Sequence, residues 1–451
     1  MSFVKFNRFL LFILFISANT IPSLAQPKMP VVLPLKERAG VINRWLQVRL
    51  NTVLPELMRR EGIDMWIVIA REYNEDPVIK TMLPANWMAA RRRTILLMYD
   101  TGKEGDVERL AVARYDIGEF FKRAWDKEKQ PDQWKRLAEI IVDKDPEKIA
   151  VNWSNTFALA DGISHAEFES FTRAIPDKYK KRIVPGENLA IGWLETRTPE
   201  EMQVYPMVCK IAHEIIVEGL SERVIQPGVT STDDVEWWYR ERIAGLKLQT
   251  WFHPSVSIQR AGEPEKRGSF ASRPDSDIIL PGDLLHIDFG ITYLRLNTDT
   301  QQHAYVLKPG EKEAPAGLRN ALKIGNRLQD ILTTNFKKGR TGNEILSKSL
   351  EQAKAEGIKP SIYTHPIGFH GHAAGPTIGM WDQQGGVPGR GDYQLLPNTA
   401  YSIELNATVA IPEWNQKEIR IMLEEDAFFD GTKVWYIDGR QEELILIPRM
   451  N

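Results

Sequence analysis

The chain of 451 residues contains a single cysteine, Cys209, and this scarcity removes two ways of stabilising a fold. One thiol forms neither an internal disulfide nor a thiolate metal cluster. A metal site in this chain must therefore be built from carboxylates and histidines. A core without cross-links is expected to form, because a chain of this length buries a large fraction of its surface on folding.

The sequence also lacks a strong net charge. Its 58 Lys and Arg residues nearly balance its 60 Asp and Glu residues, which gives a formal net charge of −2. Such a balance supplies no global positive field to hold nucleic acid. We therefore expect no nucleic-acid partner.

Long hydrophobic runs are missing, and the longest apolar stretch lies at the start of the chain. Residues 9–16 form a short apolar run behind Lys5 and Arg8, and residues 23–25 (Ser-Leu-Ala) place small residues where a signal peptidase reads. The run is too short to span a bilayer of about 30 Å, which argues against a membrane anchor. The sequence predicts a cleaved signal peptide over residues 1–25 and an exported protein, periplasmic or secreted, that leaves the membrane after cleavage.

Two patterns divide the rest of the chain. Residues 36–190 alternate helical spacing with short apolar strands such as 65–70 and 94–98, which is typical of an α/β domain. At Thr198 a capping residue, a proline and a glutamate begin a helix predicted to run to about residue 222. A second domain follows over residues 198–445, in which paired strands dominate beyond residue 250.

Four carboxylates in the second domain point to a polar site. Asp288, Glu404 and Glu424 alternate with apolar residues in predicted strands, so each is expected to face away from the core. Asp299 follows Asp288 by 11 positions, a gap that suits a hairpin. Four such acids in one cavity repel each other, and two divalent cations would cancel their charge.

Histidines accompany these acids late in the chain. Six of the eight histidines lie beyond residue 250, and His365, His370 and His372 fall within eight positions. A site with many oxygen ligands and one imidazole suits manganese, cobalt or zinc better than copper or an iron–sulfur cluster. His370 and His372 both adjoin Gly371, which permits close backbone approach, so the residues leave both open as ligands.

These segments resemble the pita-bread metallopeptidases of family M24, which include methionine aminopeptidase, aminopeptidase P and prolidase. That family uses two aspartates, one histidine and two glutamates in this order. Its I-D-x-G strand matches residues 287–290, its G-H-x-x-G motif matches 371–375, its I-E strand matches 403–404, and its acidic strand matches 424–427. Residues 36–190 resemble the creatinase-type N-terminal domain of aminopeptidase P and prolidase.

The resemblance implies an α/β N-terminal domain followed by an α+β pita-bread catalytic domain. It implies two divalent metal ions, with manganese expected and cobalt or zinc as alternatives. Asp299 and Glu424 would bridge them, with Asp288 on one metal, and His372 with Glu404 on the other. The implied metal ligands are therefore Asp288, Asp299, His372, Glu404 and Glu424.

The implied activity is hydrolysis of the N-terminal bond of a peptide substrate, by similarity an Xaa-Pro bond, through a water that bridges the metals. Glu404 would also act as general acid and base. His365, His370 or Arg420 would stabilise the oxyanion or hold the carboxylate of the substrate. Relatives are often dimers, so a homodimer stays open, as do the P1 preference and the choice between aminopeptidase and dipeptidase.

Several positions depart from the family pattern. A substrate histidine expected about seventeen residues before Asp288 is replaced by Ala271, and histidines expected four before and seven after the metal ligand are replaced by Gly368 and Gly379. The arginine expected two residues before the last glutamate is Arg420, four before it. Two alternative functions therefore stay open: a creatinase-like hydrolase of other C–N bonds that works without metals, and a non-catalytic peptide-binding protein.

Neighbouring residues have alternative interpretations. Glu425 could replace Glu424, although alternation places it on the apolar face. His286 shares the face of Asp288 and either supports the site or is an ordinary core histidine. His213 is given no role.

Overall fold

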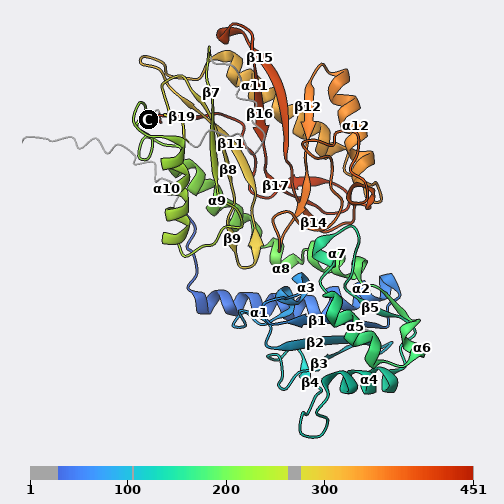
Figure 1. Ribbon diagram of the computed structural model, residues 1–451. Helices are drawn as coiled ribbons and strands as arrows, with labels where there is room; N and C mark the ends of the chain where they lie inside the picture. Colours follow the sequence, from blue (N-terminus) through green and yellow to red (C-terminus); the bar gives the residue numbers. More distant parts are fainter. Residues whose placement is uncertain (1–28, 104–105, 263–275, 450–451) are drawn as a thin grey trace, which may run out of the picture.

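The computed structural model describes residues 29–103, 106–262 and 276–449, which form a lower and an upper lobe (Figure 1). The predicted signal peptide at residues 1–25 and the substituted position Ala271 lie outside the described residues.

The lower lobe is built around a mixed six-stranded sheet in the order β4-β3-β2-β1-β5-β6. Strands β1 and β2 are antiparallel neighbours, whereas β1 and β5 are parallel. Both β1 and β2 are buried along most of their length, which explains their nearly continuous apolar sequences. The strands are β1 (Met65–Arg71), β2 (Arg93–Asp100), β3 (Val107–Ala111), β4 (Lys122–Arg123), β5 (Ile149–Val151) and β6 (Ile183–Pro185).

Helices pack around this sheet and confirm the predicted α/β fold. Helix α4 begins where the side chain of Asp132 accepts from the backbone N–H of Trp134, and α5 begins at the similarly capping Ser164. The helices are α1 (Leu35–Asn51), α2 (Val53–Glu61), α3 (Pro77–Met82), α4 (Gln133–Lys144), α5 (His165–Ala174), α6 (Asp177–Lys180) and α7 (Glu187–Glu195).

The upper lobe combines several small sheets, antiparallel except where β11 pairs in parallel with β19, with two pairs of helices. The described strands form the orders β19-β11-β8-β7, β12-β15-β16 and β13-β14-β17-β18, and β9 pairs with β10. Helices α9 and α10 contact β8 and β7, while α11 and α12 contact β15, β16 and β12, so each pair closes a separate apolar core (Figure 1). The helices are α8 (Pro199–Met202), α9 (Tyr205–Gly219), α10 (Thr232–Gly245), α11 (Ala316–Thr334) and α12 (Gly342–Ala355).

The strands of the upper lobe are mostly short. Their bounds are β7 (Ser255–Gln259), β8 (Leu284–Phe289), β9 (Thr292–Tyr293), β10 (Leu296–Asn297), β11 (Thr300–Val306), β12 (Lys359–Ile362), β13 (His365–Ile367), β14 (Thr399–Ser402), β15 (Leu405–Ile411), β16 (Lys417–Leu423), β17 (Asp426–Phe429), β18 (Val434–Tyr436) and β19 (Ile445–Ile447).

The helix predicted to begin at Thr198 does begin there, but it is not continuous. The side chain of Thr198 accepts from the backbone N–H of Glu201, whose carboxylate accepts from the N–H of Thr198 in return. Helix α8 nevertheless ends at Met202, and α9 starts at Tyr205. Pro206 in the first turn of α9 has no N–H to continue the helical ladder, which separates the two helices.

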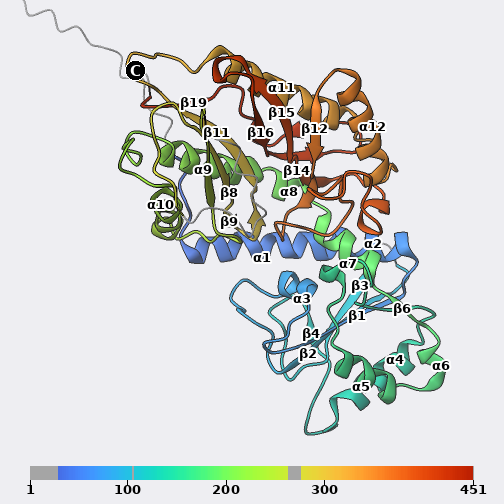
Figure 2. The same ribbon diagram turned by 45° about the horizontal axis from the view of Figure 1, so that its top comes forward.

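Helix α1 runs along the junction between the lobes (Figure 2). Its buried Arg49 forms an ion pair with Glu201 at 3.1 Å and donates to the carbonyl of Trp193. Thr196 forms an isolated bridge with Thr399 of β14, so the connecting segment joins a sheet of the upper lobe. The domain boundaries expected at residues 190 and 198 stay a prediction, and α7 extends five residues beyond the first of them.

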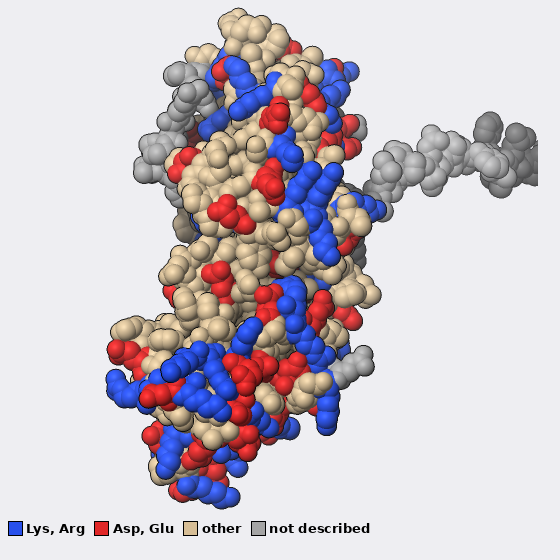
Figure 3. All heavy atoms as spheres, turned by 90° about the vertical axis from the view of Figure 1, so that its right-hand side faces the viewer, with Lys and Arg blue, Asp and Glu red and all other residues tan. Residues whose placement is uncertain are grey.

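Charges of both signs share the surface. Lys and Arg side chains are interspersed with Asp and Glu on the face shown in Figure 3, most densely over the lower lobe. This distribution agrees with the balanced composition. None of the helices in the part of the chain that the structure describes combines the length and apolarity needed to cross a bilayer.

Candidate metal centre

Asp288 and Asp299 are brought together by two neighbouring strands, as the hairpin prediction requires. Strands β8 and β11 pair antiparallel, with Gln301 opposite Asp288 and Thr300 opposite Phe289. The short β9–β10 ribbon turns the chain between them. Asp299 directly precedes β11, so both aspartates reach the same end of this ladder.

Glu404 and Glu424 lie at bends between strands, whereas the alternation around each acid predicts a continuous strand. The chain leaves β14 at Ser402 and resumes as β15 at Leu405, and it leaves β16 at Leu423 and resumes as β17 at Asp426. Strand β14 pairs with β17 and β15 pairs with β16, so one long hairpin passes from one sheet into another at both acids. The bends direct both carboxylates towards the aspartates.

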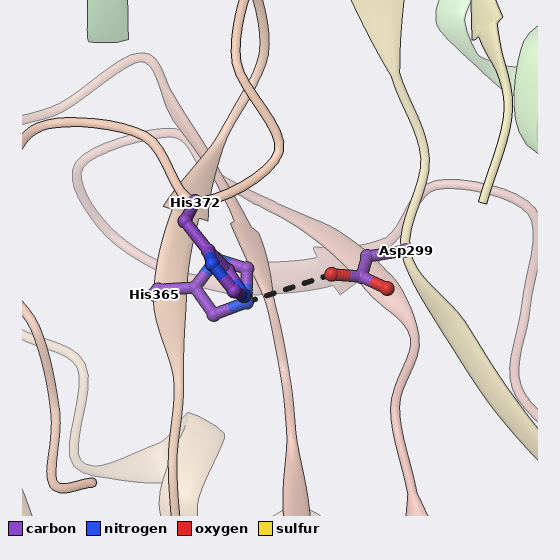
Figure 4. Close-up of side chains that lie close together, drawn as sticks. All are labelled: Asp299, His365 and His372. Carbon is purple, nitrogen blue, oxygen red and sulfur yellow. Dashed lines mark ion pairs between the residues drawn. The ribbon is translucent and has the colours of Figure 1, made fainter. Parts of the chain in front are cut away.

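The predicted acids and two histidines form three overlapping ligand groups. Within each group, one ligand atom from every residue lies within 4.8 Å of the others. The groups are Asp288 with Asp299 and Glu424, His365 with Glu404 and Glu424, and Asp299 with His365 and His372. Figure 4 shows His365 and His372 directed from one side towards Asp299. All five predicted ligands therefore meet in one place, together with His365.

His365 is oriented as a metal ligand. The side chain is 2% exposed, and its Nδ1 lies 3.0 Å from the carbonyl oxygen of Pro366, to which it must donate. In the neutral ring this leaves the lone pair on Nε2, which is 3.6 Å from Asp299 Oδ2 and 3.5 Å from Glu424 Oε1. Among the described residues Nε2 has no hydrogen-bond partner. A lone pair that faces two carboxylates is stabilised by a proton or a metal cation between them.

His372 lies further from the acids, at the exposed side of the cluster. Its ring contacts the rings of His365 and Trp251, with centroids 4.7 and 5.0 Å apart. Burial of the ring, with a smaller effect of His365, lowers the pKa of His372 to about 4, so the ring is neutral at pH 7. Tyr363 and the charge of Arg390 lie close enough to act on the same ring.

The carboxylates are deeply buried, and each is repelled by the charges of the others. Burial raises the pKa values of Asp299 and Glu404 well above their ordinary range, and the charge of Glu424 raises both further. Without cations such acids retain protons, whereas two divalent ions would cancel four negative charges. The orphaned Nε2 of His365 and this oxygen-rich donor set together fit a pair of divalent cations.

Two other predicted residues stand apart from these groups. Burial, with the charges of Lys80 and Arg197, lowers the pKa of His370 to about 4, which places its ring near the lower lobe rather than the acids. Arg420 lies on β16, about 13 Å along an extended strand from Glu424. His370 joins no ligand group in the described part of the chain. The oxyanion role expected of His365, His370 or Arg420 stays a prediction.

Glu425 has a different environment from Glu424, as strand alternation predicts. Its carboxylate accepts from the side-chain amide of Gln302 and lies 2.8 Å from Nε2 of His213. Asp438 lies 2.9 Å from Nδ1 of the same ring. Burial lowers the pKa of His213, but the two carboxylates outweigh this and raise it to about 10. His213, an ordinary histidine by its sequence context, is thus the centre of a buried ion-pair network.

This network predicts a pH-dependent part of the stability. A histidine with a pKa of about 10 when folded and about 6.5 when unfolded stabilises the fold fully below pH 6.5 and loses this contribution as the pH rises towards 10. We expect His213→Gln to lower the free energy of unfolding at pH 7 by about 3–5 kcal/mol and to flatten its decline between pH 7 and 10. Urea unfolding of both proteins across this range measures the effect, and equal slopes would contradict it.

Comparison with known proteins agrees with this geometry. The sequence profile of metallopeptidase family M24 matches residues 207–429, which include all the candidate ligands. Methionine aminopeptidase 1A of Arabidopsis thaliana is 25% identical over 220 residues, which are 43% of this chain and 53% of that protein. The match thus spans about half the length of this relative.

Solved structures extend the similarity to both lobes. The X-Pro aminopeptidase of Thermotoga maritima has a TM-score of 0.61 and 16% identity, and the match covers 87% of this chain and 99% of that one. The Xaa-Pro dipeptidase of Bacillus anthracis has a TM-score of 0.56 and 17% identity, with 92% and 100% covered. These likenesses confirm the predicted fold of an α/β domain followed by a pita-bread domain. Residues 207–429 therefore belong to metallopeptidase family M24.

Proposed function

We propose that this protein is a dinuclear-metal exopeptidase that releases the N-terminal residue of Xaa-Pro peptides. The observation that carries the proposal is the convergence of four carboxylates, three of which share a ligand group with His365, whose buried Nε2 has no hydrogen-bond partner among the described residues. Bound divalent cations would polarise the scissile carbonyl and lower the pKa of an attacking water. Manganese remains our choice among the divalent metals, and export remains a proposal from residues 1–25, checked by whether the mature chain begins at Gln26.

We propose His365, rather than the predicted His372, as the imidazole ligand. His365 belongs to ligand groups with Glu404, Glu424 and Asp299, whereas His372 belongs to one. The register of the family motif supports this change. If His365 is the ligand, the histidine expected seven residues later is His372; if His372 were the ligand, that position would be Gly379.

The remaining residues then have distinct tasks. Asp288, Asp299 and Glu424 supply negative charge to the cations, and Glu404 holds the proton that passes to the leaving amine. His372 is neutral and stands beside the ligand His365, where it can donate to the carbonyl oxygen of the substrate. Trp251 and Tyr363 flank this ring and form an aromatic surface suited to the apolar ring of proline.

The proposal is tested with the purified protein and defined peptides. We expect Mn²⁺ to support release of the first residue from an Xaa-Pro-Xaa tripeptide, with much slower release when alanine replaces proline, and a chelator to abolish it. Comparison with an Xaa-Pro dipeptide separates aminopeptidase from dipeptidase activity. Turnover by metal-free protein would support the creatinase-like alternative. A metal-loaded protein that binds these peptides without cleaving them would support the non-catalytic alternative.

A further inference from the structure

Gln301 occupies the middle of the acidic cluster, although it is neither a carboxylate nor a histidine. It lies on β11 directly opposite Asp288 of β8. Its backbone also forms a bridge with Glu424, in which Gln301 N donates to Glu424 O at 2.9 Å and Glu424 N donates back at 3.3 Å. The backbone of this one residue therefore joins the strand of Asp288 to the bend that carries Glu424.

The side-chain amide of Gln301 connects the two glutamates. Its Nε2 lies 2.9 Å from Glu404 Oε1 and 2.6 Å from Glu424 Oε2. The amide nitrogen has two hydrogens, one for each carboxylate. Donation engages one oxygen of each glutamate, so the second oxygen of each keeps a lone pair for a cation. The other oxygen of Glu424, Oε1, is the one that faces His365 and accepts from Ser402 Oγ at 2.6 Å.

The orientation of this amide is fixed from behind by His286. Nε2 of His286 lies 2.9 Å from Gln301 Oε1, and Ser257 Oγ lies 3.4 Å from the opposite nitrogen, Nδ1. Because the amide oxygen only accepts, Nε2 of His286 must carry the hydrogen. His286 therefore points the amide oxygen away from the acids and the NH₂ group towards them. A flipped amide would turn its oxygen against two carboxylates.

We infer that Gln301, oriented by His286, is a positioning residue that sets the separation of Glu404 and Glu424 for metal binding. This inference rests on the proposed function, since it assigns these glutamates to the metals. Gln301 touches no substrate in this account and acts only through the ligands. Loss of its amide leaves two adjacent carboxylates with no donor between them, so the apo site has to reorganise before cations bind.

The neighbouring Gln302 provides a matched control. Both glutamines are buried on β11, but alternation places Gln302 on the opposite face, where its amide donates to Glu425 at 2.9 Å. Glu425 belongs to no ligand group among the described residues. Replacing either glutamine with methionine removes one buried amide of similar size. Only Gln301→Met removes an amide from the proposed ligands.

The experiment measures Mn²⁺ binding by competition with a chromogenic chelator. We expect Gln301→Met to weaken Mn²⁺ binding by about 10- to 100-fold, a range typical for residues that orient metal ligands. His286→Leu should weaken it in the same direction and by less, and Gln302→Met should leave it within about threefold of the unaltered protein. Excess Mn²⁺ should restore most of kcat in Gln301→Met with KM unchanged, which a general loss of structure would not allow.

Two results would overturn the inference. One is unaltered Mn²⁺ affinity in Gln301→Met, and the other is an equal loss in Gln301→Met and Gln302→Met, which would show a structural effect of losing any buried amide. If Gln301→Met does not fold, the comparison of His286→Leu with the unaltered protein decides the question. Failure of the proposed function differs from both, because the unaltered protein itself would then bind no Mn²⁺ or cleave no peptide.

Discussion

Glu424→Gln should lose metal and nearly all activity, whereas Glu425→Gln should keep both. The two glutamates are adjacent and each is 1% exposed, yet Glu424 belongs to two ligand groups and Glu425 pairs with His213. An amide at 424 supplies no charge to the cations and offers a poorer ligand oxygen. We expect kcat/KM to fall by roughly 10³-fold or more, since a metal supplies several kcal/mol of transition-state stabilisation.

Elemental analysis beside unfolding experiments separates the two variants. Glu424→Gln should retain less than its full metal content, while its unfolding midpoint measured without metal stays the same or rises, because one buried charge is gone. Glu425→Gln should keep the metal content of the unaltered protein and be destabilised by about 3–5 kcal/mol, because His213 loses a buried partner. Full metal content and activity in Glu424→Gln would remove it from the site.

His365→Ala should cost more metal affinity than His372→Ala. His365 is buried, and its Nε2 faces Asp299 and Glu424. His372 contacts the ring of His365 from the solvent-exposed side of the cluster. Removing His365 deletes a ligand, and we expect loss of one metal ion and a fall in kcat of about 10²- to 10³-fold. Removing His372 deletes a hydrogen-bond donor to substrate, and we expect full metal content with about a tenfold loss of kcat/KM.

The two histidine variants distinguish the proposed ligand from the one that the sequence motif favours. Isothermal titration with Mn²⁺ in the absence of substrate measures the binding step alone. Loss of a site in His372→Ala with normal binding by His365→Ala would reverse the assignment. A similar small effect in both would show that neither ring binds the metal.

The positions of Asp288 and Asp299 in the metal centre are predictable from sequence because they belong to regular paired strands. The alternation around Asp288 and the 11-residue gap to Asp299 predict a hairpin, and β8 and β11 form that antiparallel pair. The short apolar segments of the lower lobe predict strands by a different pattern, a nearly continuous apolar run, since β1 and β2 are buried on both faces. Local pattern is sufficient where one ladder fixes the register.

The positions of Glu404, Glu424 and the histidine ligand depend on tertiary contacts, which a local sequence pattern does not contain. Glu404 and Glu424 were expected inside continuous strands, but pairing with two different sheets bends the chain at both. The choice among the three histidines turns on which ring nitrogen is free, and that is set by the bond from His365 Nδ1 to the carbonyl of Pro366. No spacing of residues along the chain records this orientation.

The roles of Gln301 and His213 are not predictable from sequence for a related reason. Gln301 shares the strand face of Asp299, so alternation places it beside the acids, but an amide in this position carries no sequence signal of a metal site. His213 lies 212 residues from Glu425 and 225 from Asp438, so only the tertiary fold reveals its partners. For His286 the sequence allows a supporting or an ordinary role, and its hydrogen bond to Gln301 favours the supporting one.

The most direct test of the central claim is a crystal of the unaltered protein grown with Mn²⁺ and measured near the manganese absorption edge. We predict two anomalous peaks a few ångströms apart, within coordination distance of Asp288, Asp299, His365, Glu404 and Glu424. One peak, or none, among these five side chains in a manganese-saturated crystal would contradict the account.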